Sequence, residues 1–449
     1  AQAIGSRRLL AVMRGGGVVR WLLGTVLSVS VVLIIVEWRI IQDVAYDVGA
    51  NEKRLLSVLP ALGSRLARTA GGAPLAAEAA SLALLSSAAN ATRSRAASLR
   101  GLIRSVHARI AGPALPHAFP TPPETRHYKC TRKVYNLTAL PTVAMVIPYL
   151  QENLEQMEKT IFAIIEYTPP ELLDTILFVD DGNPEAWQFH ENLTSTHPKV
   201  AIHRNEERQG LIKAKVTGAA LVSSPVIVFM EPHCIVGRTW LEPLLEKLSE
   251  SATHSIIAMP VLDIIPERNF NTYSKANLHI GGFDWSLTFN WMTTINERNK
   301  SWRMPDPYPT PALSGGVFGI WRDYWERMGT YDVDMREWGG EHIEMSLRTW
   351  RCGGRIEIVP CSHIGHMFRA KNPYTVHVEI VLRNLKRAAL VWLDGYLKEF
   401  YREMPAGRNL DAGDVSARLA LKERLGCKSM DWYIKNIYPE LLSKQPRRR

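Results

Sequence analysis

The segment 309–374 concentrates acidic, imidazole and guanidinium groups between pairs of glycines. It contains the run 337–342, E-W-G-G-E-H, and the run 361–369, C-S-H-I-G-H-M-F-R. Glycine pairs permit positive φ and close backbone approach, and loops of this kind usually carry function on a rigid scaffold. Buried aromatic residues in a turn-rich part of a large domain are the structural alternative. The density of reactive groups favours a functional site.

A second group of polar side chains follows the apolar run 226–230. Glu231 and His233 are two residues apart, so in an extended segment they project to the same side. A carboxylate and an imidazole can bind a divalent cation, and His363 or His366 would supply a third ligand. Manganese or magnesium held in this way can neutralise a diphosphate beside a nucleotide. A surface glutamate and a hydrogen-bonded histidine are the alternative, and the spacing alone does not decide between them.

Strand and helix patterns alternate from residue 143 onwards and are expected to position these groups. Strand patterns occupy 143–147, 175–179, 200–203 and 226–230, and helical patterns occupy 156–167 and 210–223. This alternation predicts a largely parallel sheet with helices on its faces. Ligands of such sheets bind beyond the carboxyl ends of the strands, where Asp180, Asp181 and Glu231 lie. No G-x-G-x-x-G or P-loop motif follows a strand, which disfavours a dinucleotide or ATP.

Composition limits the class of partner. The chain has 449 residues, 46% of them hydrophobic, and a net charge of +10. Its length permits roughly two to three domains of ~150 residues. The sequence shows neither a basic helix with spaced base-reading side chains nor zinc-finger spacing, so we expect no nucleic-acid partner. A basic protein would suit an anionic small substrate or a membrane surface.

The N-terminal region is predicted to anchor the protein in a membrane. An uncharged apolar run covers 21–36, with arginines before it and acidic residues after it. The run is short for a membrane helix but suits a thin early-secretory membrane. The positive-inside rule then predicts a cytosolic tail at 1–20, a transmembrane signal-anchor at 21–36 and a lumenal remainder. A cleaved signal peptide is the competitor, and V-E-W at 36–38 has no small-residue cleavage site.

Residues 37–124 are predicted to form a stem. Ala and Leu are abundant there and favour helix, while prolines and a G-G-A-P break at 71–74 interrupt it. A self-associating coiled coil is disfavoured because no heptad is sustained. The main domain is expected at 125–442, followed by a basic tail at 443–449. Sequons that would suit a lumenal location begin at Asn90, Asn136, Asn192 and Asn299.

A series of ordered motifs makes a family recognisable. They are T-R-H-Y-K-C at 125–130, V-D-D at 179–181, R-Q-G-L at 208–211, E-P-H-C at 231–234, W-L-E-P-L-L at 240–245, G-G-F-D-W at 281–285, W-G-G-E at 338–341, C-G-G at 352–354 and P-C-S-H-I-G-H-M-F-R at 360–369. Over roughly seventy per cent of its length, the chain resembles the polypeptide N-acetylgalactosaminyltransferases, which start mucin-type O-glycans. The short anchor and stem match that family's type II layout.

The resemblance implies a fold, an activity and a location. The fold would be α/β, of the glycosyltransferase-A type: a Rossmann-like nucleotide-binding sheet flanked by helices, preceded by a transmembrane helix and a helical stem. The activity would be retaining transfer of N-acetylgalactosamine from UDP-GalNAc to Ser/Thr hydroxyls of secretory-pathway proteins, with manganese as the ion. The location would be the Golgi membrane, single-pass, with the catalytic domain in the lumen. The family commonly carries a C-terminal lectin module, which we do not expect here because the chain stops short of one.

The resemblance also implies roles for matching residues. Implied metal ligands are Glu231, His233 and His366. Implied catalytic residues are Glu341, which would position acceptor and sugar, Trp338, which matches a lid tryptophan, and Arg369. Implied substrate contacts are Asp180 or Asp181 and Arg208 for the nucleotide, Tyr374 on the loop closing over UDP, Gly315 and Gly316 for the sugar, and Phe283 and Trp285 for a peptide groove.

Several positions depart from the family pattern. Glu231 stands where the family usually has Asp, His342 where it has Asn, and P-Y-L-Q-E at 148–152 where it has F-H-N-E. Glutamate is one methylene longer but is still a good oxygen ligand, so we expect weakened rather than lost metal binding. A catalytically silent relative that binds UDP-sugar or peptide is therefore one alternative. An enzyme of the same fold with another donor, such as UDP-GlcNAc, is a second.

Five cysteines fit an oxidising lumen and leave one thiol over. By motif position, the resemblance implies disulfides Cys130–Cys361 and Cys352–Cys427, with Cys234 free. A zinc site is disfavoured because no pair has C-x-x-C spacing.

Overall fold

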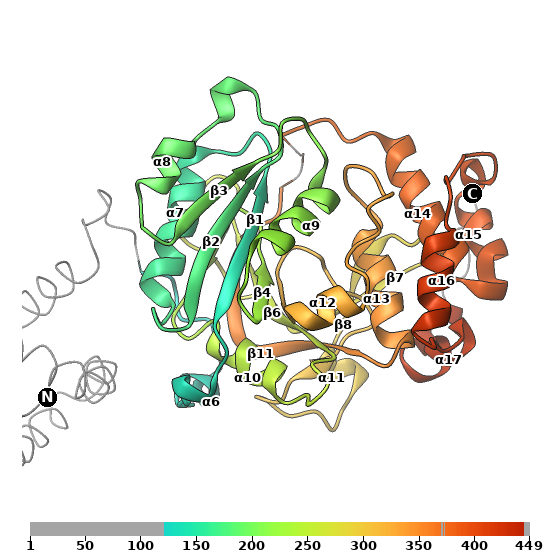
Figure 1. Cartoon of the computed structure of the whole chain (residues 1–449). Helices are drawn as coiled ribbons and strands as arrows, with labels where there is room; N and C mark the ends of the chain where they lie inside the picture. The colour runs from blue at the N-terminus through green and yellow to red at the C-terminus, as the bar shows by residue number, and fades with distance from the viewer. Residues whose placement is uncertain (1–120, 370, 372, 444–449) are drawn as a thin grey trace, which may run out of the picture. The chain divides into compact units, whose positions relative to one another are not determined.

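The computed structural model describes residues 121–443 apart from 370 and 372 (Figure 1). The predicted tail and signal-anchor, nearly all of the predicted stem and all but the first residue of the predicted basic tail lie outside these residues. Within the part that is described, no helix combines the length and apolar character needed to cross a membrane.

A nine-stranded sheet organises the described residues, with strand order β3-β2-β1-β4-β10-β6-β11-β5 and β9 added beside β11. Its strands are β1 (Val143–Tyr149), β2 (Leu173–Asp180), β3 (Val200–Arg204), β4 (Val226–Phe229), β5 (Cys234–Val236), β6 (Ile256–Ile265), β9 (Tyr308–Pro309), β10 (Phe318–Trp321) and β11 (Arg355–Met367). A two-stranded ribbon is formed by β7 (His279–Phe283) and β8 (Phe289–Thr294).

The strands β1 to β4 form the parallel unit that the sequence predicts. β1 pairs in parallel with β2 and β4, and β2 pairs in parallel with β3. Every residue of β1 is buried. Because side chains alternate along a strand, Val143 and Met145 pack into one core, whereas Ala144 and Val146 pack into the other. This explains why β1 reads as an unbroken apolar run.

Beyond β4 the sheet is mixed, so the prediction of a largely parallel sheet is wrong for this half. β10 is antiparallel to β4 and β6, and β11 is parallel to β6 but antiparallel to β5 and β9. Parallel neighbours require crossover connections that are usually helical. After β6 the chain continues instead into a ribbon and loops, and β10 enters the sheet in the reverse direction.

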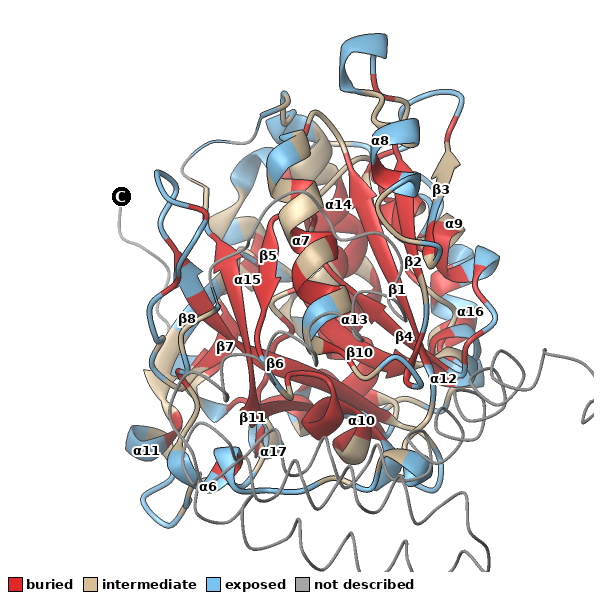
Figure 2. Ribbon diagram, turned by 90° about the vertical axis from the view of Figure 1, so that its left-hand side faces the viewer, coloured by how far each residue is buried: buried red, intermediate tan, exposed pale blue. Residues whose placement is uncertain are grey.

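Helices cover both faces of the sheet. α7 (Leu154–Tyr167) and α10 (Glu242–Ser249) contribute to one core; α9 (Leu211–Leu221), α13 (Glu341–Arg351) and α14 (Val378–Trp392) contribute to the other. Figure 2 shows the buried strands behind α7, whose outer side is partly exposed. The remaining α-helices are α6 (Tyr128–Thr131), α8 (His190–Thr194), α11 (Ile295–Arg298), α12 (Arg322–Arg327), α15 (Leu397–Glu403), α16 (Ser416–Arg424) and α17 (Met430–Asn436). Short 3₁₀ helices are η1 (Leu137–Ala139), η2 (Glu185–Trp187), η3 (Asp394–Tyr396), η4 (Pro405–Arg408) and η5 (Pro439–Ser443).

The cysteine pairing is confirmed. One disulfide joins Cys130 to Cys361 in β11, and the other joins Cys352, directly after α13, to Cys427. Cys234 is buried and takes part in no disulfide. Three of the sequon asparagines, Asn136, Asn192 and Asn299, lie in the described residues and are exposed.

A buried carboxyl group at the start of α10 leads to a first prediction. Burial raises the pKa of Glu242 to about 7, although backbone N–H groups and Arg126 act against it. A carboxyl group whose pKa is raised in the folded state favours folding most when it is protonated, below its ordinary pKa. Its contribution to the free energy of unfolding is lost as the pH rises towards 7. We therefore expect Glu242→Gln to gain about 2 kcal/mol of stability over the parent between pH 5 and pH 8.

Thermal or urea unfolding at the two pH values measures this difference. The matched control is Glu246→Gln, a half-exposed side chain on the same helix that pairs with Lys133. It should change stability equally at both pH values. A Glu242→Gln effect that is the same at pH 5 and pH 8 would contradict the raised pKa.

Candidate active site

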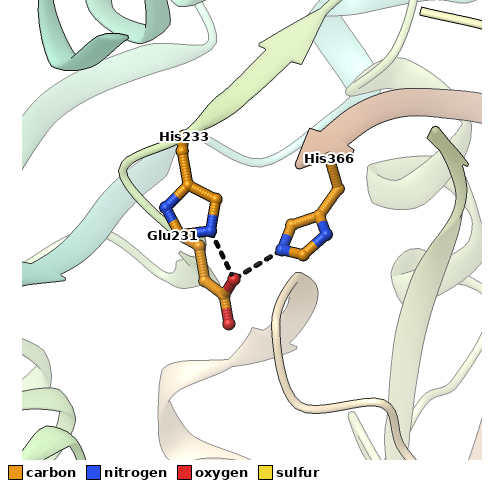
Figure 3. Close-up of side chains that lie close together, drawn as sticks. All are labelled: Glu231, His233 and His366. Atoms are coloured by element: carbon orange, nitrogen blue, oxygen red, sulfur yellow. Dashed lines mark hydrogen bonds and ion pairs between the residues drawn. The ribbon is translucent and has the colours of Figure 1, made fainter. Parts of the chain in front are cut away.

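The three implied metal ligands converge at one point (Figure 3). One ligand atom from each of Glu231, His233 and His366 lies within 4.8 Å of the others. Nε2 of His366 lies 2.5 Å from Oε2 of Glu231, and Nε2 of His233 lies 3.1 Å from the same oxygen. Both imidazoles therefore face one carboxylate oxygen.

Strand pairing explains why residues so distant in sequence meet. Glu231 and His233 lie in the turn between β4 and β5, and β5 pairs antiparallel with β11 so that His366 stands opposite Cys234. The sequence left His363 and His366 open as the third ligand, and the structure selects His366. His363 lies elsewhere, buried with Nδ1 3.0 Å from Asp263.

The donor set fits a divalent cation. One carboxylate and two imidazole nitrogens suit first-row transition metals, manganese among them. Burial alone would raise the pKa of Glu231, but the charge of His366 and hydrogen bonds from His233 and His366 hold that pKa well below its usual value. Burial alone would lower the pKa of His233, but the carboxylates of Glu152 and Glu231 raise that pKa above its usual value. The cluster thus carries a carboxylate ready to act as a ligand.

A cavity of about 260 Å³ opens beside this cluster. Its lining combines the three ligands with anionic and cationic side chains from four other segments. Predicted site residues that line it are Asp181, Arg208, Glu231, His233, Trp338, His366, Arg369 and Tyr374. The structure therefore brings most of the predicted site together.

The adjacent residues Asp180 and Asp181 have different surroundings. Asp180 is fully buried, and its carboxylate receives His190 and Arg204 at 2.9 Å each. Asp181 instead lines the cavity and accepts two backbone N–H bonds at the start of α9. Burial raises the pKa of Asp181. Of the two residues, Asp181 is the one that can meet a ligand.

The loop that contains Gly210 lies in close contact with the loop that contains Glu337, at one side of the cavity. A Cβ on Gly210 would lie 2.2 Å from Cα of Glu337, so only glycine allows this contact. Arg208, in the same loop, lies 3.3 Å from Glu337 and over the ring of Tyr374 at 5.4 Å. The contact places Trp338 in the cavity wall.

Gly316 lies next to Glu231, while Gly315 and Glu341 lie beside His342, and none of the three lines the cavity. Glu341 is buried in the first turn of α13 and accepts the backbone N–H of Gly339 at 2.9 Å. A Cβ on Gly316 would lie 3.3 Å from Oε1 of Glu231, and Gly315 adopts φ +84° against His342. The absence of a side chain at Gly316 leaves room for the longer Glu231, and its absence at Gly315 leaves room for His342.

Lys215 of α9 is a buried cation that the sequence patterns do not single out. Its Nζ donates to the carbonyl of Gly315 at 2.8 Å. Burial lowers the pKa of Lys215, and the nearby carboxylates of Glu341 and Glu231 oppose that change. The lysine holds the carbonyl of Gly315 and offsets the negative charges of Glu341 and Glu231. No period or motif marks it, because a lysine in an amphipathic helix is usually solvated.

Glu152 is a second residue that sequence reasoning missed. It follows β1, lines the cavity and receives both terminal nitrogens of Arg369, at 2.8 and 2.5 Å. Its place just after a parallel strand is the signal that could have found it, since Asp181 and Glu231 occupy the same kind of place. The departure from F-H-N-E drew attention to the run but not to this residue.

The peptide-groove prediction does not fit the burial of its two residues. The ring of Phe283 is fully buried beside Tyr433, and Trp285 stacks on Tyr396 with ring centroids 5.3 Å apart. Their faces are covered by the C-terminal helices. Both aromatics belong to one hydrophobic core; Phe283 is the last residue of the buried part of β7, and Trp285 follows that strand.

Other aromatic rings are accessible instead. Trp291 is 39% exposed and Phe368 is 45% exposed. Phe289 is partly buried, with its ring 5.1 Å from Trp291 and 5.9 Å from His342. The alternation F-N-W in β8 is the sequence signal for these rings.

Comparisons with known proteins agree with this geometry. The glycosyl transferase family 2 model matches residues 144–324, and a model described as the N-terminal domain of galactosyltransferase matches residues 298–373. The GT-A-like sheet and the site beyond its strand ends thus have the fold of a glycosyltransferase.

The relatives identify the family. Polypeptide N-acetylgalactosaminyltransferase 4 of Mus musculus is 39% identical over 322 residues, covering 71% of this chain and 55% of the relative. Polypeptide N-acetylgalactosaminyltransferase 14 of Homo sapiens is 39% identical over 324 residues, covering 71% and 58%. A crystal structure of GalNAc-T7 with UDP, GalNAc and Mn²⁺ is 30% identical with a TM-score of 0.66, covering 72% of this chain and 62% of that one. The chain belongs to the polypeptide N-acetylgalactosaminyltransferase family, and it spans a little over half the length of these curated relatives.

Proposed function

We propose that the protein transfers N-acetylgalactosamine from UDP-GalNAc to Ser or Thr hydroxyls of polypeptides, with retention at the sugar and with manganese. The observation that carries the proposal is the cluster Glu231–His233–His366 at a cavity that also holds Arg208 and Arg369. The family name of the relatives and the UDP, GalNAc and Mn²⁺ of the GalNAc-T7 crystal support the same donor and ion.

In the proposed reaction, the acidic and basic side chains have different roles. The three ligands hold the cation, which when bound neutralises charge on the leaving diphosphate. Arg369 and Arg208 supply donor forks for phosphate oxygens. Asp181 lies where a carboxylate can accept hydrogen bonds from the nucleotide.

Acceptor and sugar are positioned on the other side of Glu231. In retaining transfer the acceptor hydroxyl attacks on the leaving-group face, and the departing phosphate takes its proton. Glu341, held ionised by His342 despite its burial, which alone would raise its pKa, orients acceptor and sugar. The accessible rings of Trp291 and Phe368 offer flat apolar faces to a Pro- or Thr-rich peptide.

A silent UDP-sugar or peptide-binding role is the second candidate. Two observations favour it. Glu231 is one methylene longer than the aspartate usual in the family, and both terminal nitrogens of Arg369 are already paired with Glu152. A same-fold enzyme with another UDP-sugar donor is a further variant of the first candidate.

A donor-by-peptide panel separates these functions. The chain is incubated with UDP-GalNAc or UDP-GlcNAc and a Thr-rich peptide, with Mn²⁺ or with EDTA. Mn²⁺-dependent transfer from UDP-GalNAc supports the proposal, and transfer from the other donor alone corrects the substrate. Mn²⁺-dependent binding of UDP without turnover supports the silent role.

Shortening Glu231 provides a second prediction. Because misplacement by ~1 Å at a catalytic site can cost ~100-fold, Glu231→Asp is expected to raise the transfer rate up to ~100-fold and to lower the Mn²⁺ concentration needed for half-maximal rate. Rates over a Mn²⁺ titration measure both. Glu207→Asp, an exposed position, serves as the control. If neither the parent nor Glu231→Asp transfers the sugar, the active-enzyme proposal fails.

We also propose a Golgi location with a type II anchor. The apolar run 21–36 and its flanking charges support this, and two disulfides fit an oxidising compartment. Protease protection of the main domain in sealed microsomes tests the topology.

A further inference from the structure

Glu152 stands between the metal cluster and Arg369, and one of its oxygens faces both. Oε1 lies 2.8 Å from a terminal nitrogen of Arg369 and 3.4 Å from Nδ1 of His233. Oε2 takes the other terminal nitrogen of Arg369 at 2.5 Å. The carboxylate is only 4% exposed. Each partner is therefore held in a largely dry environment, where such contacts are strong.

The Glu152 carboxylate lies beside Nδ1 of His233, a buried nitrogen that forms no hydrogen bond in the described residues. Nε2 of His233 faces Glu231 at 3.1 Å, so the nitrogen on the far side, Nδ1, faces Glu152. A carboxylate on the far nitrogen of a ligating histidine fixes the tautomer and the ring orientation, and makes the ligand more basic. Glu152 is placed to do this for His233.

The contact between Glu152 and Arg369 makes the arginine less available to an anion. The guanidinium gives its two-pronged face to Glu152 and a further hydrogen bond to Gln156 at 3.2 Å. Two-pronged pairs of this kind are among the strongest side-chain hydrogen bonds. In this arrangement Arg369 is committed to Glu152, and a phosphate group has to compete for it.

We propose that Glu152 is a positioning residue that couples the two halves of the site: it orients His233 for the cation, and it restrains Arg369 from phosphate while the cation is absent. The inference rests on the proposed metal and UDP site and adds an order to it. A coordinated imidazole is the stronger N–H donor, so cation binding draws Oε1 towards His233 and loosens its hold on Arg369. Cation and diphosphate then strengthen each other's binding, as linkage requires.

Glu152→Gln separates the two roles because it should change two affinities in opposite directions. MnCl₂ alone and UDP in EDTA are titrated calorimetrically into the purified 449-residue chain. Mn²⁺ affinity is expected to fall about 10–100-fold, the usual cost of losing such a partner. UDP affinity in EDTA is expected to rise about two- to tenfold, because Arg369 loses a competing charged acceptor. A purely structural role would lower both affinities together.

Two further variants complete the test. Glu155→Gln removes an exposed carboxylate three positions away, one that pairs with Lys159, and should change neither affinity. The double variant Glu152→Gln/Arg369→Gln removes the unpaired guanidinium, so it covers the case in which the single variant fails to fold. It should keep the Mn²⁺ loss and show no UDP gain.

The outcomes distinguish the inference from the function beneath it. If the unsubstituted chain binds neither MnCl₂ nor UDP, the proposed site itself is wrong. If the unsubstituted chain binds both and Glu152→Gln behaves like Glu155→Gln, or loses both affinities together, only the coupling is overturned.

Discussion

Replacing His366 by alanine is expected to lower the affinity for Mn²⁺ by at least about 100-fold, because losing even an outer partner of a metal ligand costs about 10–100-fold. The change removes one of three converging ligands and leaves Nε2 of His233 alone beside Glu231. Calorimetric titration with MnCl₂ measures this without reference to turnover. Transfer of N-acetylgalactosamine, if the proposed function holds, should fall at least as far.

The control for this prediction is an exposed histidine. His254 stacks on Trp321 and pairs with Asp323, outside the residues that line the cavity. His254→Ala should leave Mn²⁺ affinity unchanged. Should His366→Ala bind Mn²⁺ as tightly as the parent, the ion is held elsewhere and the mechanism argued from this cluster fails.

Removing the Cys352–Cys427 disulfide is expected to cause a large loss of stability. Cys352 and Cys427 are 75 positions apart, and a cross-link that closes a loop of this length stabilises by about 4 kcal/mol in the chain-entropy description. Cys427→Ser should therefore lower the free energy of unfolding by about that amount. Urea unfolding without reductant measures it. Because Cys352 is the C-cap of α13, the last turn of that helix should also loosen.

A matched cysteine change isolates the cross-link. Cys234 is buried without a disulfide, so Cys234→Ala tests the loss of a thiol alone and should cost no more than about 1–2 kcal/mol. Parent protein treated with reductant loses both disulfides, so it should be less stable than Cys427→Ser. A Cys427→Ser loss below about 1 kcal/mol would show that the cross-link contributes little.

A strand or helix could be predicted where the residues of that segment alone determine its secondary structure. The run 143–147 predicted β1, observed at Val143–Tyr149, because both of its faces are covered and every side chain is apolar. The apolar patterns of β2 to β4 and the helical periodicity of α7 likewise predicted those elements. The direction of β10 was not predictable, because an apolar run carries no information about which neighbour it will join.

The same distinction between local sequence and tertiary structure applies to the individual residues of the site. Motifs identified Glu231, His233 and Arg369, but the choice between His363 and His366 depends on the antiparallel register of β5 and β11. The choice between Asp180 and Asp181 depends on which side of the strand end faces the cavity. Glu152 and Lys215 were missed because their importance comes from partners more than 80 positions away, such as Arg369 and Gly315.

The order of strands and helices in the first half, the cysteine partners implied by family motifs and the chemical types gathered for a metal-assisted transfer are all properties of the sequence alone. Which carboxylate faces the ligand, which imidazole completes the cluster, and that a buried glutamate joins that cluster to an arginine were decided only by the tertiary structure. The physical reason is that local patterns report burial and backbone preference, whereas side-chain convergence is set by the pairing of distant strands.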